Sequence, residues 1–204
     1  MGKIKEDLIA GYQAFQTEAD KQLYSKLGRG QSPRVMVIGC ADSRVDPLKI
    51  FNANPGDIFV TRNVANIVPP SNWGDKYDST MAAIEYAVTV LKVEMLMVMG
   101  HASCGGVKGC LDGMGDRPDE SHVSAWVSLL NRARDKVVSD KRCQDNQAFA
   151  LELEGVRTSL ENLMTFPFVK KAVDAGELKL QGAYFSIADA QLLLANEAGE
   201  FKAA

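Results

Sequence analysis

Short apolar segments that alternate with helical segments constrain the fold of this chain more than any other feature. Residues 35–39, 58–61 and 95–99 form short apolar runs that contain β-branched side chains, as is typical of strands buried on both faces of a sheet. A stretch with helical spacing, 79–91, separates the second run from the third. Strands that alternate with helices in this way indicate a parallel sheet covered by helices.

The remaining segments complete this prediction. Helical spacing recurs at 120–137, 147–164 and 169–175. Strand-forming residues at 178–187 and 191–195 predict a hairpin, and apolar side chains over 3–27 indicate one or two amphipathic helices. We therefore expect an α/β fold with a mostly parallel central sheet flanked by helices, an N-terminal helical arm and a C-terminal antiparallel edge strand.

Length and composition limit how many domains the chain can form and which classes of molecule it can bind. The 204 residues are 46% hydrophobic and 24% charged, with a net charge of −3, which is ordinary for a soluble globular protein. No linker-like segment divides the chain, so we expect a single domain over 1–204, with the arm at 1–30 and a core at 31–204. The mild acidity offers nothing to attract nucleic acid or an anionic membrane, and no apolar run reaches the roughly 18 residues of a transmembrane helix. Because the N-terminus lacks the long apolar core of a signal peptide, we expect a cytoplasmic protein.

Two of the buried runs end in residues that can bind a metal ion. Cys40 follows the run at 35–39, and both His101 and Cys104 follow the run at 95–99. Because the carboxyl ends of parallel strands meet at one edge of a sheet, we expect these side chains to lie together. Two thiolates and one imidazole suit zinc, and three protein ligands leave one position open, as in catalytic zinc sites.

A structural role is the alternative for each ligand taken alone. Cysteines are often small buried hydrophobes, and a histidine can be a satisfied core residue. The joint placement of Cys40, His101 and Cys104 at the ends of two strands favours the metal site. We assign no role to the residues that lack ligand-like spacing, Cys110, Cys143 and His122.

Asp42 and Arg44 lie directly after the first predicted ligand. Opposite charges at alternate positions of a tight turn can form a bidentate pair, in which the Asp stays ionised. Such an Asp can accept a hydrogen bond from a water or hydroxide on the metal and orient it. The alternative is that Asp42 caps the next helix and Arg44 is a solvated neighbour.

Three motifs in this order resemble those of the β-carbonic anhydrases: Cys40-Ala41-Asp42-Ser43-Arg44, Arg62-Asn63-Val64-Ala65-Asn66 and Gly100-His101-Ala102-Ser103-Cys104-Gly105-Gly106. The resemblance is close over 31–109. It implies zinc-dependent, reversible hydration of carbon dioxide to bicarbonate and a proton, with one zinc ion per chain. It also implies a homodimer or a multiple of dimers, in which the N-terminal arm wraps a neighbouring subunit.

Within that family the chain is similar to the plant-like subclass, and the resemblance implies further site residues. Gln31 would donate a hydrogen bond to a substrate oxygen, and Gly105 would lie against the substrate. Phe59, Val64 and Tyr86 would shape a small apolar pocket at a subunit interface. In this mechanism a zinc-bound hydroxide, oriented by the pair of Asp42 and Arg44, attacks carbon dioxide.

Other functions stay open at this point. The same residues can serve the hydrolysis of a related linear substrate, carbon disulfide or carbonyl sulfide, and direct turnover of each gas would separate these reactions. A non-catalytic zinc protein is an alternative of a different class, although it would need neither Asp42 nor Arg44. Nucleotide binding has little support, because residues 100–106 do not match Gly-x-Gly-x-x-Gly and the sequence has no Walker motif.

Overall fold

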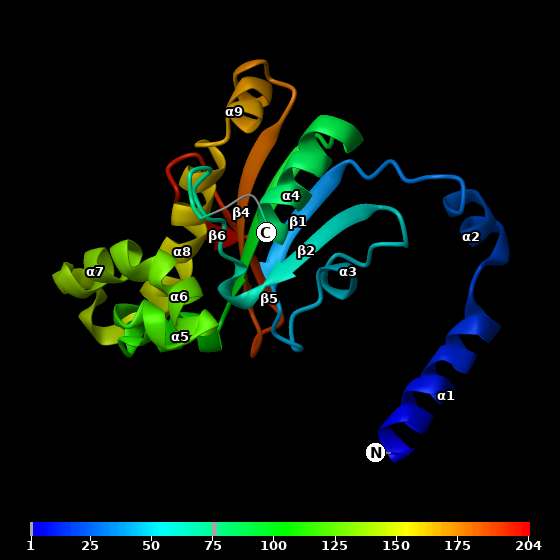
Figure 1. Cartoon of the computed structure of the whole chain (residues 1–204), viewed down its shortest axis with the longest axis horizontal. Helices are drawn as coiled ribbons and strands as arrows, with labels where there is room; N and C mark the ends of the chain where they lie inside the picture. The colour runs from blue at the N-terminus through cyan, green and yellow to red at the C-terminus, as the bar shows by residue number, and fades with distance from the viewer. Residues whose placement is uncertain (1, 75–76) are drawn as a thin grey trace. The chain divides into compact units, whose positions relative to one another are not determined.

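A computed structural model describes residues 2–74 and 77–204 of the chain, which divide into two compact units (Figure 1). The first unit extends to Ser32 and contains α1 (Gly2–Glu18) and α2 (Lys21–Leu27). Asp20 caps α2, because its side chain accepts the backbone N–H groups of Gln22 and Leu23 at 2.8 and 3.1 Å. The prediction of one or two helices in the arm is thus confirmed, and the number is two.

A six-stranded sheet forms the centre of the second unit, Pro33–Ala204, with the strand order β2-β1-β3-β4-β5-β6. The strands are β1 (Val35–Cys40), β2 (Ile58–Asn63), β3 (Met95–His101), β4 (Lys179–Ser186), β5 (Gln191–Ala195) and β6 (Phe201–Ala203). The first four pair in parallel, and β5 and β6 are antiparallel. The predicted mixed sheet is therefore confirmed.

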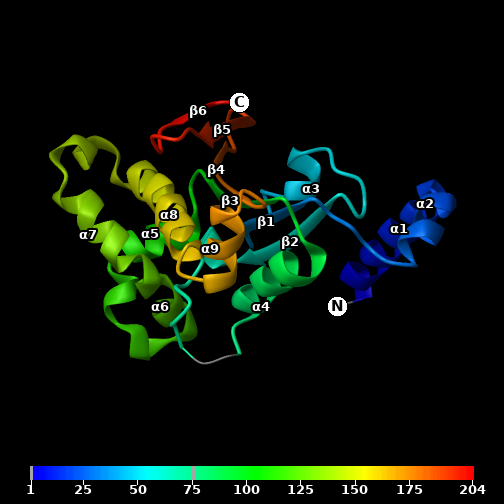
Figure 2. The ribbon, with the colours of Figure 1, turned by 90° about the horizontal axis from the view of Figure 1, so that it is seen from above.

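Helices cover both faces of this sheet (Figure 2). In chain order they are α3 (Pro47–Ile50), α4 (Ser79–Glu85), the π-helix η2 (Tyr86–Leu91), α5 (Gly105–Leu111), α6 (His122–Val127), α7 (Asn131–Ser139), α8 (Gln147–Leu163) and α9 (Pro167–Asp174). Short 3₁₀ segments lie at η1 (Val64–Asn66), η3 (Met114–Asp116), η4 (Pro118–Glu120), η5 (Ser128–Leu130) and η6 (Lys141–Asn146). Figure 2 shows α4, α8 and α9 on one side of the strands and α3 on the other.

The central strands are buried on both faces, which explains their uninterrupted apolar sequences. On one face Ile38 of β1 belongs to a cluster with Val156 of α8, and on the other Val37 packs in a cluster with Ile50 at the end of α3. A third cluster joins α5, α7 and α8 through Cys110, Val137 and other buried side chains. The third cluster also contains Cys40 and Cys104, so the predicted ligands lie within the core.

The structure differs from the sequence prediction in three segments. The single helix expected over 120–137 is divided, because extended Ser121 caps α6 and a 3₁₀ turn separates α6 from α7. The short helix α3 and the strand β6 were not predicted, since both are too short to show a period. Consequently β6, and not β5, forms the edge of the sheet. None of the helices in the described part of the chain is long and apolar enough to cross a membrane.

Gly100 provides a test of the packing between β3 and α8. A Cβ atom at this position would lie 2.7 Å from Val156 Cγ2, which is too close for α8 to remain in place. We expect Gly100→Ala to lower the free energy of unfolding by about 1–3 kcal/mol, measured by urea denaturation. Gly39→Ala, also in a buried strand, is the matched control, because its Cβ would meet Pro47 Cγ at an ordinary 3.5 Å. Equal losses in both variants would contradict this account.

Candidate metal centre

The parallel pairing of β1 with β3 brings the first two predicted ligands together. Cys40 ends β1 and His101 ends β3, and the register of the two strands pairs Gly39 with Met99. Cys104 follows after Ser103, whose left-handed backbone (φ 56°) turns the chain back toward the sheet. Three ligands from two strand ends therefore converge, as the sequence predicted.

The distances between the ligand atoms fit a tetrahedral zinc ion. The candidate atoms of Cys40, His101 and Cys104 all lie within 4.8 Å of one another, and all three residues are buried. The two sulfur atoms are 3.9 Å apart, and both cysteines are free thiols. Two sulfurs bound at roughly 2.3 Å to a tetrahedral centre would be about 3.8 Å apart. The thiols are thus already at the spacing that zinc requires.

His101 supplies independent evidence for a metal ion. Its Nδ1 atom donates a hydrogen bond to the carbonyl oxygen of Ala102 at 2.9 Å, which fixes the tautomer and leaves the lone pair on Nε2. Among the described residues, Nε2 is the buried side-chain nitrogen or oxygen that has no hydrogen-bond partner. A buried polar atom without a partner is costly, so a ligand at this position is expected. A zinc ion between the two sulfurs and Nε2 would remove this cost.

The two thiols have pKa values that are shifted in opposite directions. The hydrogen bond from Cys104 and the neighbouring His101 lower the pKa of Cys40 to about 4, although burial opposes this shift. The pKa of Cys104 is raised instead, because of its hydrogen bond with Cys40 and its buried environment. A bound zinc ion would hold both sulfurs as thiolates.

Asp42 and Arg44 form a bidentate pair beside this group. Arg44 Nε and Nη2 donate to the two carboxylate oxygens of Asp42 at 2.9 and 2.7 Å, and the backbone N–H of Arg44 donates to Oδ1 at 2.9 Å. These hydrogen bonds hold the pKa of Asp42 well below its usual range. The alternative of a helix cap is wrong, because Asp46 caps α3.

Two neighbours of the site carried no predicted role. Arg62, at the end of β2, donates to the carbonyl oxygens of Cys40, Asp42 and Val45 at 2.8, 2.6 and 2.8 Å and so fixes the turn that carries Asp42. Glu152 of α8 accepts the backbone N–H of Cys104 at 3.1 Å. The sequence feature that could have identified Arg62 is a charged residue at the carboxyl end of a buried strand. Glu152 gave no signal, since its partner is 48 residues away.

The other predicted site residues lie outside the group of three ligands. Val64 lies against Gly106, where an added Cβ would come within 2.7 Å of Val64 Cγ1, and Gly105 faces open space. Phe59 and Tyr86 contact each other with ring centroids 6.0 Å apart. Gln31 belongs to the unit that ends at Ser32. The roles of these five residues stay predictions.

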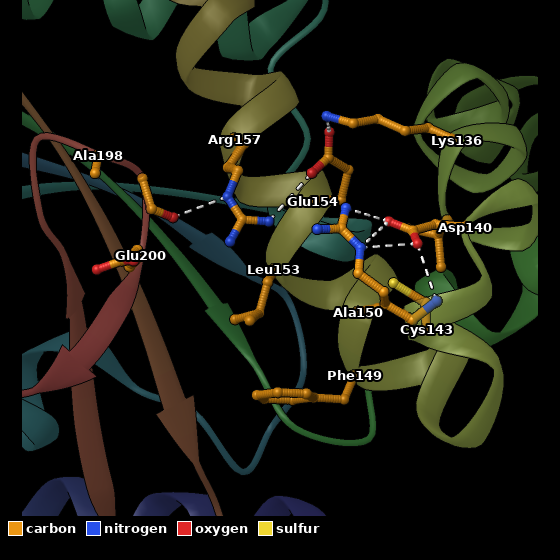
Figure 3. Close-up of a pocket in the computed structure, with 13 residues that line it drawn as sticks. Lys136, Asp140, Cys143, Phe149, Ala150, Leu153, Glu154, Arg157, Ala198 and Glu200 are labelled. Atoms are coloured by element: carbon orange, nitrogen blue, oxygen red, sulfur yellow. Dashed lines mark hydrogen bonds and ion pairs between the residues drawn. The ribbon is translucent and has the colours of Figure 1, made fainter.

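A separate cavity of about 610 Å³ opens beside α8 (Figure 3). Five of its charged side chains pair with one another: Lys136 and Arg157 contact Glu154, and Arg142 contacts Asp140. None of the predicted site residues is among the described residues that line it. The predicted site residues therefore lie elsewhere than in the lining of this cavity.

Comparisons with known proteins agree with this geometry. Residues 35–192 match the carbonic anhydrase family. The chain is 36% identical over 190 residues to beta carbonic anhydrase 3 of Arabidopsis thaliana, an alignment that covers 88% of this chain and 72% of the relative. Its structure is similar to that of the beta-carbonic anhydrase CcaA (31% identity, TM-score 0.90, 98% of this chain and 99% of that chain). It is also similar to tetrameric beta-carbonic anhydrases of Sordaria macrospora (30% identity, TM-score 0.72, 99% of this chain and 94% of that chain).

Metal analysis tests the three ligands. We expect the purified protein to hold about one zinc ion per chain, measured by mass spectrometry of the metal after gel filtration. His101→Ala should lose this zinc, because the buried Nε2 ligand is removed. Cys143→Ser is the matched control, since Cys143 is a free thiol outside the ligand group, and it should retain zinc. Retention of zinc by His101→Ala would exclude this site.

Proposed function

The chain belongs to the β class of the carbonic anhydrase family, and we propose that Asp42 and Arg44 orient the attacking oxygen in its reaction. As a carbonic anhydrase, it catalyses the reversible hydration of carbon dioxide to bicarbonate and a proton, with zinc as its cofactor. The observation that carries the proposal is the bidentate pair of Asp42 and Arg44, which lies two residues beyond the ligand Cys40.

Cys40, His101 and Cys104 would hold the zinc ion, which would supply a bound water with a lowered pKa. Asp42 then has one task that its environment favours. The hydrogen bonds from Arg44 lower the pKa of Asp42, so its carboxylate stays an acceptor. Asp42 would then accept a hydrogen bond from the attacking oxygen. The lone pair of that oxygen would stay free for the substrate. An acceptor is required for this, since a donor would occupy the lone pair.

Arg44 keeps Asp42 in this position. It holds both carboxylate oxygens and also donates from Nη2 to the carbonyl oxygen of Ser103 at 3.1 Å, which links the turn after β1 to the turn after β3. Without these hydrogen bonds the carboxylate of Asp42, two residues after Cys40, could turn to the metal ion and become a fourth ligand. Arg44 therefore keeps the fourth position available for water.

Apolar side chains would receive carbon dioxide. Val64 and Tyr86 are 38% and 45% exposed, which leaves them available to a small linear substrate or to a second subunit. We assign Phe59 to the same pocket through its contact with Tyr86. Gly105, whose missing side chain leaves open space, would let the substrate approach, and Gln31 would donate to a substrate oxygen.

The assembly and location of the protein complete the proposal. We assign the chain to one domain, with a helical arm at 1–30 and a zinc-binding core at 31–204. It would form a homodimer or a multiple of dimers, and the supporting observation is that Ile4 and Leu8 of α1 are 70% and 72% exposed in the single chain. The protein would act in the cytoplasm on dissolved carbon dioxide and bicarbonate, without nucleic acid or membrane partners.

Asp42→Asn tests the orienting role. The amide keeps the size of the side chain but loses the charge and one acceptor, so we expect the rate of carbon dioxide hydration to fall roughly 100-fold, the effect of a misplaced reacting group. Zinc content should stay unchanged, because Asp42 is not a ligand. The measurements are stopped-flow hydration at about pH 8 and metal analysis of the same sample.

Asp140→Asn is the matched control for this experiment. Asp140 and Arg142 form the same pair two residues apart, with Nε and Nη2 of Arg142 donating at 3.0 and 2.6 Å, and lie away from the ligand group. This variant should hydrate carbon dioxide at the normal rate.

Normal activity of Asp42→Asn would remove Asp42 from the mechanism. Bound zinc in the unaltered protein, without turnover of carbon dioxide at any pH, would indicate a non-catalytic zinc site, and turnover of carbonyl sulfide in its place would indicate the hydrolase.

A further inference from the structure

Glu152 is an acidic side chain in the core that the mechanism above does not use. It lies on α8, in the part of the helix that packs against β3 and α5, and only 6% of its surface is exposed. A carboxyl group is costly to bury unless its oxygens are hydrogen-bonded. Here both oxygens have a donor: Oε1 accepts the backbone N–H of Cys104 at 3.1 Å, and Oε2 accepts the hydroxyl group of Tyr184 at 2.7 Å.

The backbone N–H of Cys104 lacks a local partner. Cys104 is the N-cap residue of α5, and its own side chain makes no capping hydrogen bond, because the sulfur faces Cys40. In many helices a Glu or Gln at the third helical position accepts the N–H of the N-cap residue. That position in α5 is Val107, which cannot accept a hydrogen bond. Glu152 fills this role from another helix.

Tyr184 fixes Glu152 in turn. Its ring is buried in β4, the strand next to β3, and its hydroxyl donates to Glu152. Burial and the neighbouring Glu152 raise the pKa of the Tyr184 phenol, so it stays a neutral donor. Phe149, which lines the cavity in Figure 3, packs edge-on against this ring with centroids 5.4 Å apart. The carboxyl group is therefore held on both sides.

We infer that Glu152 and Tyr184 form a positioning pair that holds Cys104 in place as a zinc ligand. This inference rests on the proposed zinc site. The rotation of the Cys104 backbone determines where its sulfur lies, and the hydrogen bond from its N–H to Glu152 fixes that rotation. Residues behind the ligands commonly change metal affinity or activity by roughly 10- to 100-fold when they are removed.

Three variants separate this role from a general contribution to stability. Glu152→Ala removes both acceptors, and Tyr184→Phe removes the hydroxyl group while it keeps the ring. Glu152→Gln is the conservative variant, because its amide oxygen can still accept the N–H of Cys104 while its amide nitrogen faces Tyr184. The last two variants are nearly isosteric with the native residues, so they give an answer even if Glu152→Ala fails to fold.

The readout is the rate at which the zinc-loaded protein releases zinc to an excess of chelator, compared with the thermal midpoint of the metal-free protein. We expect zinc release to accelerate roughly 10- to 100-fold in Glu152→Ala, and by a smaller factor in Tyr184→Phe. Glu152→Gln should release zinc at close to the native rate. The order of the three variants is itself a prediction: if the negative charge of Glu152 were what mattered, Glu152→Gln would release zinc as fast as Glu152→Ala, and if bulk alone mattered, Tyr184→Phe would behave like the native protein.

Ser159→Ala is the matched control. Ser159 is buried in the same helix and bonds with Val68 and Asn66, away from Cys104, so its loss should lower the thermal midpoint and leave zinc release unchanged. Native zinc release in Glu152→Ala and Tyr184→Phe, or release that changes only in proportion to the thermal midpoint as in Ser159→Ala, would overturn the inference. Absence of zinc from the unaltered protein would instead overturn the proposed metal site.

Discussion

The parallel pairing of β1 with β3 is the interaction on which the rest of the site depends. It places Cys40 and His101 at the same edge of the sheet, and the short turn after His101 then brings in Cys104. The register is strongly specified, because both faces of these strands are buried: Ile38 and Val37 belong to separate clusters on opposite faces. A shift by one residue would exchange the two faces and also move Cys40 away from His101. The same side chains that stabilise the core thus determine the distance between the ligands.

A buried metal centre also requires that the surrounding polar groups have partners. Arg62 donates to three carbonyl oxygens of the turn between Cys40 and Val45, which would otherwise point into a region without regular secondary structure. Ala102 supplies the acceptor for His101 Nδ1, and Glu152 supplies the acceptor for the N–H of Cys104. Among the described residues, the buried side-chain nitrogen or oxygen that remains without a partner is His101 Nε2, beside the sulfur atoms of Cys40 and Cys104. The fold therefore brings the lone pairs of three possible metal ligands to one place.

The sequence alone predicted the features that depend on local patterns. The apolar runs identified β1, β2 and β3, and the ligand set followed from the rule that parallel strands end at one edge of a sheet. It did not predict β6, the start of α6 or the division between α6 and α7. Segments of a few residues show no period, α6 begins at a single hydrogen bond from Ser124 N–H to Ser121, and the 3₁₀ turn Ser128–Leu130 that follows α6 is equally short. Glu152 was missed for a different reason. In sequence it is one more acidic residue on an amphipathic helix, and only the packing of α8 against β3 and α5 shows that it faces Cys104.

Charge balance connects this architecture with the proposed reaction. Two thiolates would offset the charge of a bound zinc ion, a neutral His101 would add none, and Asp42 is offset by Arg44, so the loaded site would be close to neutral. A site with three neutral imidazoles would carry two positive charges and would hold an anion more strongly. Such a neutral centre would favour a neutral substrate such as carbon dioxide and would give the bicarbonate product little electrostatic attraction. Two thiolate ligands would therefore make a zinc-bound water less acidic than three imidazoles would, but they would assist release of the product, and this cost in acidity gives weight to the orienting role proposed for Asp42 and Arg44.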